Sequence, residues 1–339
     1  MTLVPTVTMT LGELRYGAHV ESVRLDLRAL PGVNAGVVVL PAGARMDAGP
    51  GDPAVLELDG GEGAETVLTG AVRTVRTGLR ETRVTVADGS VDLAALRPAA
   101  TYERQDAKAV IRALASDAGV DAGRLDVDLE LAAYVADQAR TAAEHVAALA
   151  TLAGAVATFG AGGTLAVAAP AAAPDVALKY GRDLVACEVV DASGPTATPV
   201  PVGFGPAGSP QAPGALRHTV GVLPSGAPAA GRDALRAPTA VLRSPGVATV
   251  AGLAAAQRRA AEGRRLRARA FLLPWLRPGA VLEIQDLPDR LQDGAWLVTA
   301  VSHRLAPRTG GATVFEGRAA SGGAAGLLAS AAAAIGSLL

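Results

Sequence analysis

Apolar and charged positions alternate in the N-terminal part of the chain. Val23, Leu25 and Leu27 are separated by Arg24 and Asp26, which is the two-residue period of a β-strand that buries one face. Further strand-like runs occupy residues 55–58, 69–76 and 83–89. Gly- and Asp-rich turns at 47–52, 59–63 and 88–89 separate them. The pattern predicts an antiparallel sheet that closes into a small barrel, because closure removes exposed strand edges.

The spacing of apolar residues then changes to that of helices. One helix is predicted to begin after Asp106, a residue suited to the N-cap, and to stop at Gly119. A second helix is predicted to begin at Thr141, which forms a capping-box sequence with Glu144. A hairpin with a Gly-rich turn follows. Residues 97–172 are therefore expected to form a small α/β insert.

Strands are predicted again over 184–190 and 199–202. The next segment, 203–246, is rich in Pro and Gly and cannot bury a core of its own, so we expect a long loop there. A helix from about Thr249 to Glu262 then leads back into β structure.

This later β structure repeats the order of the earlier elements. Each copy has a Pro-Gly turn, a strand containing Val-Leu-Glu, a long strand with a late Arg, and a return strand ending in an acidic residue and Gly. The copies run from Pro50 to Gly89 and from Pro278 to Gly317. Such self-similarity indicates two like modules in one chain.

The expected fold class is α+β and mainly β, with two similar antiparallel β-barrel domains, a small α/β insert between them and a C-terminal helical tail. A length of 339 residues fits two or more domains. The predicted division is a first β-barrel domain at 1–96, the insert at 97–172, a second β-barrel domain at 173–320 containing the loop 203–246, and an Ala/Leu-rich tail at 321–339.

The chain is rich in apolar residues and nearly neutral. Hydrophobic residues make up 50%, and 31 basic residues against 32 acidic ones leave a net charge of −1. This balance gives no electrostatic reason to expect specific nucleic-acid binding or an anionic membrane. The N-terminus lacks the pattern of a signal peptide, and no long apolar run predicts a membrane anchor. Cys187 is the only cysteine, which excludes an intrachain disulfide and fits assembly in a reducing cytoplasm.

The sequence offers no catalytic, cofactor-binding or metal-binding constellation. The four histidines are scattered, without the spacing of a metal site. Cys187 has no neighbouring base and is expected to be a buried small hydrophobe. His303 is expected to point outward from its strand or to lie at a subunit contact. A G-x-G-x-x-G match over 203–208 is interrupted by Pro206, so we interpret it as a plain loop.

An arginine-rich strand is one candidate for protein contacts. Arg265, Arg267 and Arg269 alternate with apolar residues, so they project from one face. We predict that this face lies at a subunit seam, opposite carboxylates such as Asp26 or Glu57. A solvated barrel face and the lining of a lumen are the alternatives.

The C-terminal tail is the other candidate. Leu327, Leu328, Ile335 and Leu338 lie on one helical stripe. An exposed apolar stripe on a short terminal helix is typical of a docking surface, so a partner protein is expected there. Packing of the tail on its own barrel is the alternative.

Several segments together resemble a known family. They are PGDPAVLELDG and TGAVRTVR near the start, TYERQDAKAVIRALASDAGV in the middle, and LRPGAVLEIQD with GAWLVTAVSHRLAPRTGGATVFEG near the end. In this order they are similar to the late control gene D proteins of phage tails, which are related to the N-terminal hub part of the VgrG spike proteins. The resemblance covers nearly the whole chain.

The resemblance implies a non-enzymatic hub of a phage tail baseplate or contractile injection system. In such hubs, the two barrels of three subunits alternate around a ring that adapts a sixfold tail tube to a threefold spike. The implied partners are two further copies in a homotrimer, a separate spike protein, a tail tube or tube-initiator protein, a tape measure protein and baseplate wedge proteins. The protein would be a component of a virion tail or injection particle. The alternatives are a type VI-like export spike component and, disfavoured, a cell-wall-degrading tail enzyme.

Overall fold

The computed structural model describes residues 5–17, 19–44, 46–192, 198–202, 234–238, 241–242, 245–288, 294–306 and 310–320. Its first module contains β1 (Thr6–Leu11), β2 (Leu14–Tyr16), β3 (Ser22–Arg28), β4 (Ala35–Pro41), β5 (Pro53–Asp59), β6 (Ala64–Thr77) and β7 (Glu81–Ala87). The second module contains β13 (Val176–Lys179), β14 (Leu184–Asp191), β17 (Arg264–Phe271), β18 (Val281–Gln285), β19 (Gly294–Ala306) and β20 (Gly310–Ala319). The fold is mainly β with antiparallel pairing and few helices, as predicted.

The remaining elements lie between these modules or within the second one. Helix α1 (Ser90–Ala95) precedes β8 (Ala100–Asp106), α2 (Ala107–Asp117), β9 (Ala122–Leu125), β10 (Glu130–Ala136), α3 (Ala142–Leu152), β11 (Val156–Phe159) and β12 (Leu165–Ala168). Between β14 and β17 lie β15 (Thr198–Val202), β16 (Ala234–Pro238) and α4 (Pro245–Glu262). The predicted domain boundaries fall between α1 and β8 and between β12 and β13, and the division itself stays a prediction.

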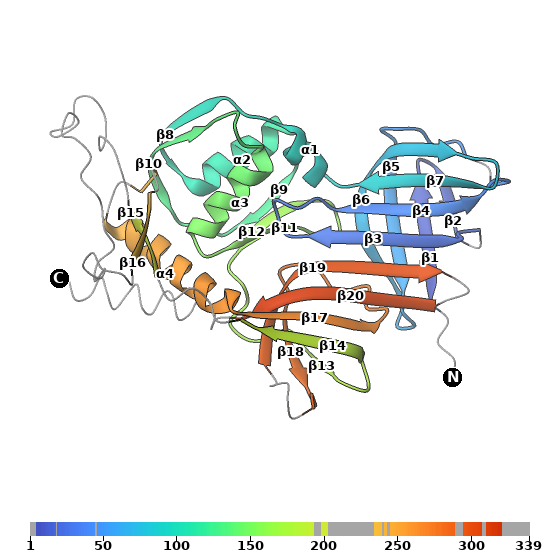
Figure 1. Cartoon of the computed structure of the whole chain (residues 1–339). Coiled ribbons are helices and arrows are strands. Elements are labelled where there is room, and N and C mark those ends of the chain that lie inside the picture. The colour runs from blue at the N-terminus through green and yellow to red at the C-terminus, as the bar shows by residue number, and fades with distance from the viewer. Residues whose placement is uncertain are drawn as a thin grey trace.

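Both modules belong to one hydrogen-bonded sheet. Its 13 strands follow the order β14-β17-β20-β19-β3-β4-β7-β6-β5-β1-β2, with β18 also paired to β19 and β13 to β18. The link between the modules is the antiparallel pair of β3 and β19. Figure 1 shows these two strands side by side in the middle of the molecule.

The two modules share their topology. In chain order, β1, β3, β4, β5, β6 and β7 correspond to β13, β14, β17, β18, β19 and β20. In the sheet, β3-β4-β7-β6-β5-β1 corresponds strand by strand to β14-β17-β20-β19-β18-β13. The modules differ in that β13 runs parallel to β18, whereas β1 runs antiparallel to β5, and in that β2, the partner of β1, has no counterpart among the described strands of the second module. The predicted repeat is therefore confirmed at the level of strand order.

Hydrogen bonds at the Pro-Gly turns fix how the copies align. The Gly51 N–H donates to the Val72 carbonyl at 2.8 Å, and the Gly279 N–H donates to the Val298 carbonyl at 2.9 Å. Both glycines have a positive φ, 99° and 94°, a backbone conformation that favours glycine. Counting from them aligns Leu56 with Ile284. The match of the two Val-Leu-Glu triplets is thus shifted by two residues, which leaves the same strand face buried.

One hydrophobic core runs through both modules and contains buried side chains from β1, β3, β4, β17 and β19. The sheet curls over this core. Gly36 on β4 faces β5, which is three strands away in the sheet order, so closely that an added Cβ would lie 2.7 Å from Leu56 Cδ1. A larger residue at this position would have to displace the buried Leu56 side chain.

A second core holds the helices of the middle segment. As predicted, Asp106 caps α2 by accepting a hydrogen bond from the Ala109 N–H at 2.7 Å, and Thr141 and Glu144 form a capping box on α3. Gly119 follows α2 with a φ of 69°. The later segment departs from the prediction in two ways. Helix α4 begins earlier than expected, at Pro245, and β16 is a strand inside the predicted loop 203–246.

Candidate assembly interface

Within one chain, the modules meet along β3 and the second half of β19. The cross-strand pairs on the core side are Val23–Leu305, Leu25–His303 and Leu27–Val301, and all six side chains are buried. The ladder continues past the end of β3, where the Ala29 N–H donates to the Thr299 carbonyl at 3.1 Å. The contact is therefore a complete strand pairing with an apolar underside.

His303 is the one ionisable side chain on the buried side of these pairs. It is fully buried, and its Nδ1 lies 3.0 Å from Thr313 Oγ1. Burial, and then the nearby charge of Arg277, lower the pKa of His303 to about 4. The expectation that His303 points outward is wrong. It alternates in phase with Val301 and Leu305, and this phase places it on the core side.

Arg277 forms a second link between the modules. It precedes the Pro-Gly turn of the second module, and its Nη2 donates to the carbonyls of Thr66 and Val67 on β6 of the first module, at 2.8 and 2.9 Å. Burial lowers the pKa of Arg277. Leu272, five residues before Arg277, packs closely against Gly60 of the first module. A Cβ added at Gly60 would lie 2.6 Å from the Leu272 carbonyl oxygen. These contacts fix the first module against the second.

A buried polar network lies where the first module joins α1. The Asp88 carboxylate accepts hydrogen bonds from Asn34 Nδ2 at 2.7 Å and from the Ser90 N–H at 2.9 Å. The Asn34 N–H in turn donates to Ser90 Oγ at 2.8 Å. Burial raises the pKa of Asp88 despite these bonds. Because its partners come from the fold itself, we interpret this carboxyl group as structural.

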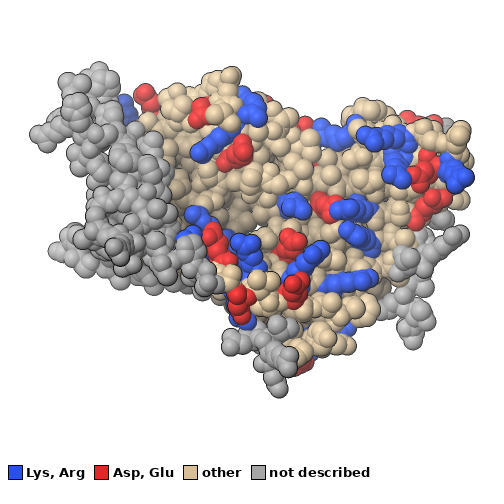
Figure 2. Space-filling view, viewed as in Figure 1, with Lys and Arg blue, Asp and Glu red and all other residues tan. Residues whose placement is uncertain are grey.

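The polar face of the sheet carries interleaved charges. Arg265, Arg267 and Arg269 are exposed on β17. On the neighbouring strands, Arg267 faces Glu188 of β14 and Glu316 of β20. Figure 2 shows basic and acidic side chains mixed over this part of the surface. Within the chain, the carboxylates beside the arginine face are thus Glu188 and Glu316, and its placement at a subunit seam stays a prediction.

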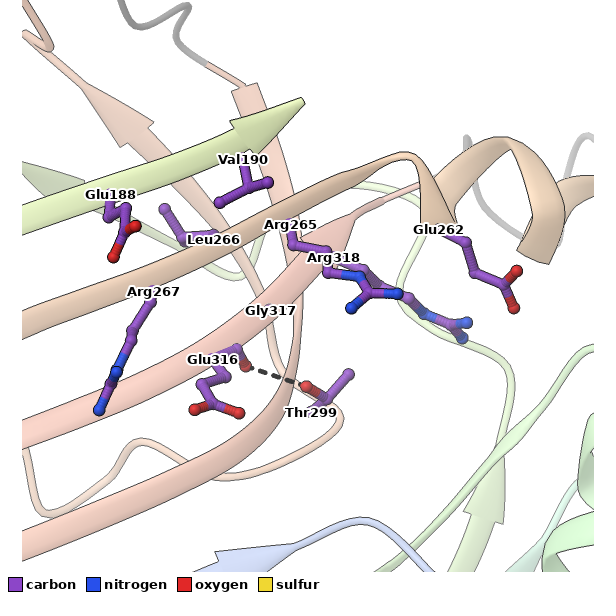
Figure 3. A pocket seen from close by; sticks show the side chains of 10 residues that line it. All are labelled: Glu188, Val190, Glu262, Arg265, Leu266, Arg267, Thr299, Glu316, Gly317 and Arg318. Carbon is purple, nitrogen blue, oxygen red and sulfur yellow. Dashed lines mark hydrogen bonds between the residues drawn. The ribbon is translucent and has the colours of Figure 1, made fainter. Parts of the chain in front are cut away.

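A hollow of about 420 Å³ opens on this face beside α4. Figure 3 shows its lining, which comes from β14, β17, β20, β19 and the end of α4. The charged lining residues are Glu188, Glu262, Arg265, Arg267, Glu316 and Arg318. Burial and the charge of Arg258 lower the pKa of Arg318. The ionisable groups in its lining are three glutamates and three arginines, so it offers ionic contacts.

Two further side chains, Cys187 and His145, bear on the question of catalysis. Cys187 is partly buried on β14, and burial raises its pKa, whereas a reactive thiol needs a lowered one. His145 is held by the Tyr134 hydroxyl at 2.7 Å and the Asp137 carbonyl at 3.0 Å. Burial raises the pKa of Tyr134 to about 12. Across the described ranges, no three His, Cys, Asp or Glu side chains cluster as metal ligands would.

Two predicted features fall on residues that the structure does not describe. The predicted docking residues Leu327, Leu328, Ile335 and Leu338 belong to 321–339, which the description does not cover. The G-x-G-x-x-G match over 203–208 also lies outside it. Among the helices that are described, none has the length and apolar character needed to span a membrane.

The sequence matches no protein-family model, and no curated protein is detectably similar to it. The structure, however, is similar to solved structures. One is the tail protein from Neisseria meningitidis MC58, with a TM-score of 0.67 and 14% identity over 93% of this chain and 96% of that one. Another is the 43 kDa tail protein of prophage MuSo2 from Shewanella oneidensis, with a TM-score of 0.67 and 15% identity over 92% and 98%.

A third similar structure is the E. coli c3393 protein, described as a component of the type VI secretion system with similarity to the T4 bacteriophage tail proteins gp27 and gp5. Its TM-score is 0.62 at 10% identity, over 92% of this chain and 77% of that one. The chain therefore has the fold of phage tail proteins and of type VI secretion components related to them. At such low identity the similarity establishes the fold alone.

Proposed function

We propose that this chain is a structural, non-enzymatic subunit of the central hub of a phage tail baseplate or contractile injection particle. Three copies form a ring that adapts a sixfold tail tube to a threefold spike. The single observation that carries this proposal is the repeat of six strands in the same chain and sheet order. A closed ring of three such chains offers six like modules, which matches the symmetry of both neighbours.

The fold similarity to phage tail proteins supports the same proposal. Membership of the late control gene D family remains part of it. The proposed partners are a separate spike protein, a tail tube or tube-initiator protein, a tape measure protein and baseplate wedge proteins, with the tail 321–339 as one docking element. Assembly would take place in the bacterial cytoplasm. The raised pKa of Cys187 argues against catalysis by that thiol.

A type VI-like export spike component is the second candidate, and the similarity to the E. coli type VI secretion component favours it. Both candidates place the chain in a trimeric ring, so the partner distinguishes them. Co-expression with a tail tube protein and, separately, with a type VI tube protein should show stable capture of one and not the other.

The ring itself can be tested with the purified chain. Sedimentation equilibrium over a range of concentrations should give the mass of three subunits, and electron micrographs should show closed rings. A chain that stays monomeric at all concentrations, or that digests purified cell wall, would contradict the proposed hub.

A further inference from the structure

We infer that neighbouring subunits pair β14 of one chain antiparallel with the second half of β6 of the next, in the register of the internal β3–β19 pair. The inference deepens the proposed ring and rests on it. By their places in the sheet, β14 is the counterpart of β3 and β6 is the counterpart of β19. The contact that joins the modules within a chain can therefore form again between chains, with the roles of the modules exchanged.

Both strands have an edge available for this pairing. Among the described strands, β14 is paired along its length with β17 alone. Strand β6 pairs with β5 along its first half and with β7 on the opposite edge of its second half. Strand β19 pairs with β18 along its first part, and on the same edge its second half pairs with β3. The corresponding half of that edge in β6 has no strand partner in the described part, and such an edge is a template for another strand.

The repeat also fixes the register. The bulge in β6 against β7 and the bulge in β19 against β20 occupy corresponding positions, Val72/Thr74 and Val298/Ala300. We traced the strand pairings across the sheet from these bulges to find the counterpart of each β3–β19 pair. Asp26–Ser302 corresponds to Val190–Arg76, and Leu25–His303 corresponds to Val189–Thr77. The first of these intersubunit pairs lies on the polar face and the second on the core side.

Exposure and charge along the two edges fit a second copy of the chain. Val185 and Val190 on β14 are 51% and 48% exposed, and Leu79, in the turn after β6, is 100% exposed. In this register Val190 would lie opposite Arg76, whose aliphatic stem would cover part of it, and Leu79 would lie near Cys187, three residues along β14. Glu188 precedes Val190 by two residues on the same face, so it would become the diagonal neighbour of Arg76, within reach of a long side chain.

A disulfide across the predicted pair is the direct test. Cys187 is first replaced by Ser, and Arg76→Cys and Val190→Cys are then combined in that chain. Residues directly opposite each other in an antiparallel pair have Cα atoms about 4.5–5.5 Å apart, which a disulfide can bridge. Mild oxidation should yield covalent dimers and then trimers on a non-reducing gel, with no larger species, and reduction should return monomers.

The matched control combines Arg76→Cys with Ala186→Cys. Ala186 lies on the same face of β14 but four residues away, about 13 Å along the strand, so this pair should not cross-link. If wild-type protein is trimeric but the predicted pair fails to cross-link, or the control pair cross-links equally well, the strand pairing is wrong and the ring stands. If wild-type protein is a monomer at every concentration, the proposed function fails as well.

Charge reversal gives a readout that does not depend on a disulfide. Arg76→Glu and Glu188→Arg should each weaken self-association by roughly two- to fivefold, which is the scale of a cross-strand charge pair. The double variant should recover part of this loss in sedimentation equilibrium. Additive weakening in the double variant would count against contact between these two residues.

Discussion

Acid should weaken the seam between β3 and β19 through one histidine. His303 is fully buried opposite Leu25, in the middle of that seam. Its pKa in the folded chain is about 4, against an ordinary value of 6.5, chiefly because burial disfavours the charged ring and next because Arg277 is near. In the unfolded chain, His303 takes up a proton below pH 6.5, whereas in the folded chain it does so only near pH 4.

The contribution of His303 to the free energy of unfolding is therefore complete above pH 6.5, and it decreases as the pH falls to about 4. One pKa unit is equivalent to 1.36 kcal/mol, so the loss over this range is about 3 kcal/mol. Other groups titrate in the same range, and the buried Asp88 acts in the opposite direction because its pKa is raised. The effect of His303 must therefore be measured as a difference between two chains.

The comparison is between the wild type and His303→Asn, whose side-chain amide can still reach Thr313. Urea unfolding is followed by tryptophan fluorescence, since Trp296 is fully buried in the second module. The difference in unfolding free energy should shift in favour of the variant by about 3 kcal/mol between pH 7 and pH 4. The matched control is His19→Asn, at an exposed histidine outside the seam, which should not reproduce this shift. Parallel curves for His303→Asn would show that the histidine is not held neutral by the seam.

Three further variants test other parts of the structure. Gly70→Ala places a Cβ 2.1 Å from a backbone carbonyl oxygen of β7, so it should destabilise the chain by about 1–3 kcal/mol in thermal or urea unfolding. Arg277→Met removes two hydrogen bonds from a charged donor to carbonyls of β6, and should cost about 1.5–3 kcal/mol in the same assay. Replacing Arg265, Arg267 and Arg269 together with Ala should weaken trimers at physiological salt, as measured by sedimentation equilibrium.

Each of these changes has a control or a contrary outcome. Gly49→Ala adds a Cβ with nothing within 4 Å and should leave stability unchanged. Arg304→Met removes an exposed arginine of β19, and a loss as large as that of Arg277→Met would show that general charge, not the carbonyl contacts, is responsible. Trimers of unchanged strength in the triple arginine variant would remove the arginine face from the subunit seam.

The parts of the fold predicted correctly from the sequence depend on neighbouring residues. The cap of α2 at Asp106 and the capping box of α3 are formed by side chains within a few residues of the backbone groups they satisfy. The strand at Val23–Leu27 follows from a period-two pattern with one buried face. These signals involve no distant part of the chain, so they can be read before the fold is known.

The contacts that define the interface could not be read in this way. Strand β3 pairs with β19 from the far end of the chain, and local alternation does not identify that partner. The outward placement predicted for His303 is wrong because the strand phase that it shares with Val301 and Leu305 places its side chain on the core side. Strand β16 was missed because the Pro- and Gly-rich composition of 203–246 indicates a loop, while its pairing with β15 is set by position in the fold.

The repeat explains why one chain has both an internal seam and open edges. A chain of two like modules makes one module contact internally, through β3 and β19. The counterpart edges, on β14 and on the second half of β6, have no strand partner in the described part. An interface between unlike surfaces builds a ring if its rotation closes and a filament if it does not. Closure with three chains requires the step within a chain and the step between chains to add up to one third of a circle, and a pseudo-sixfold ring requires each step to be close to one sixth. The internal seam already sets one of these steps, so substitutions that loosen it, at His303 or Arg277, should yield open or irregular assemblies along with their loss of stability.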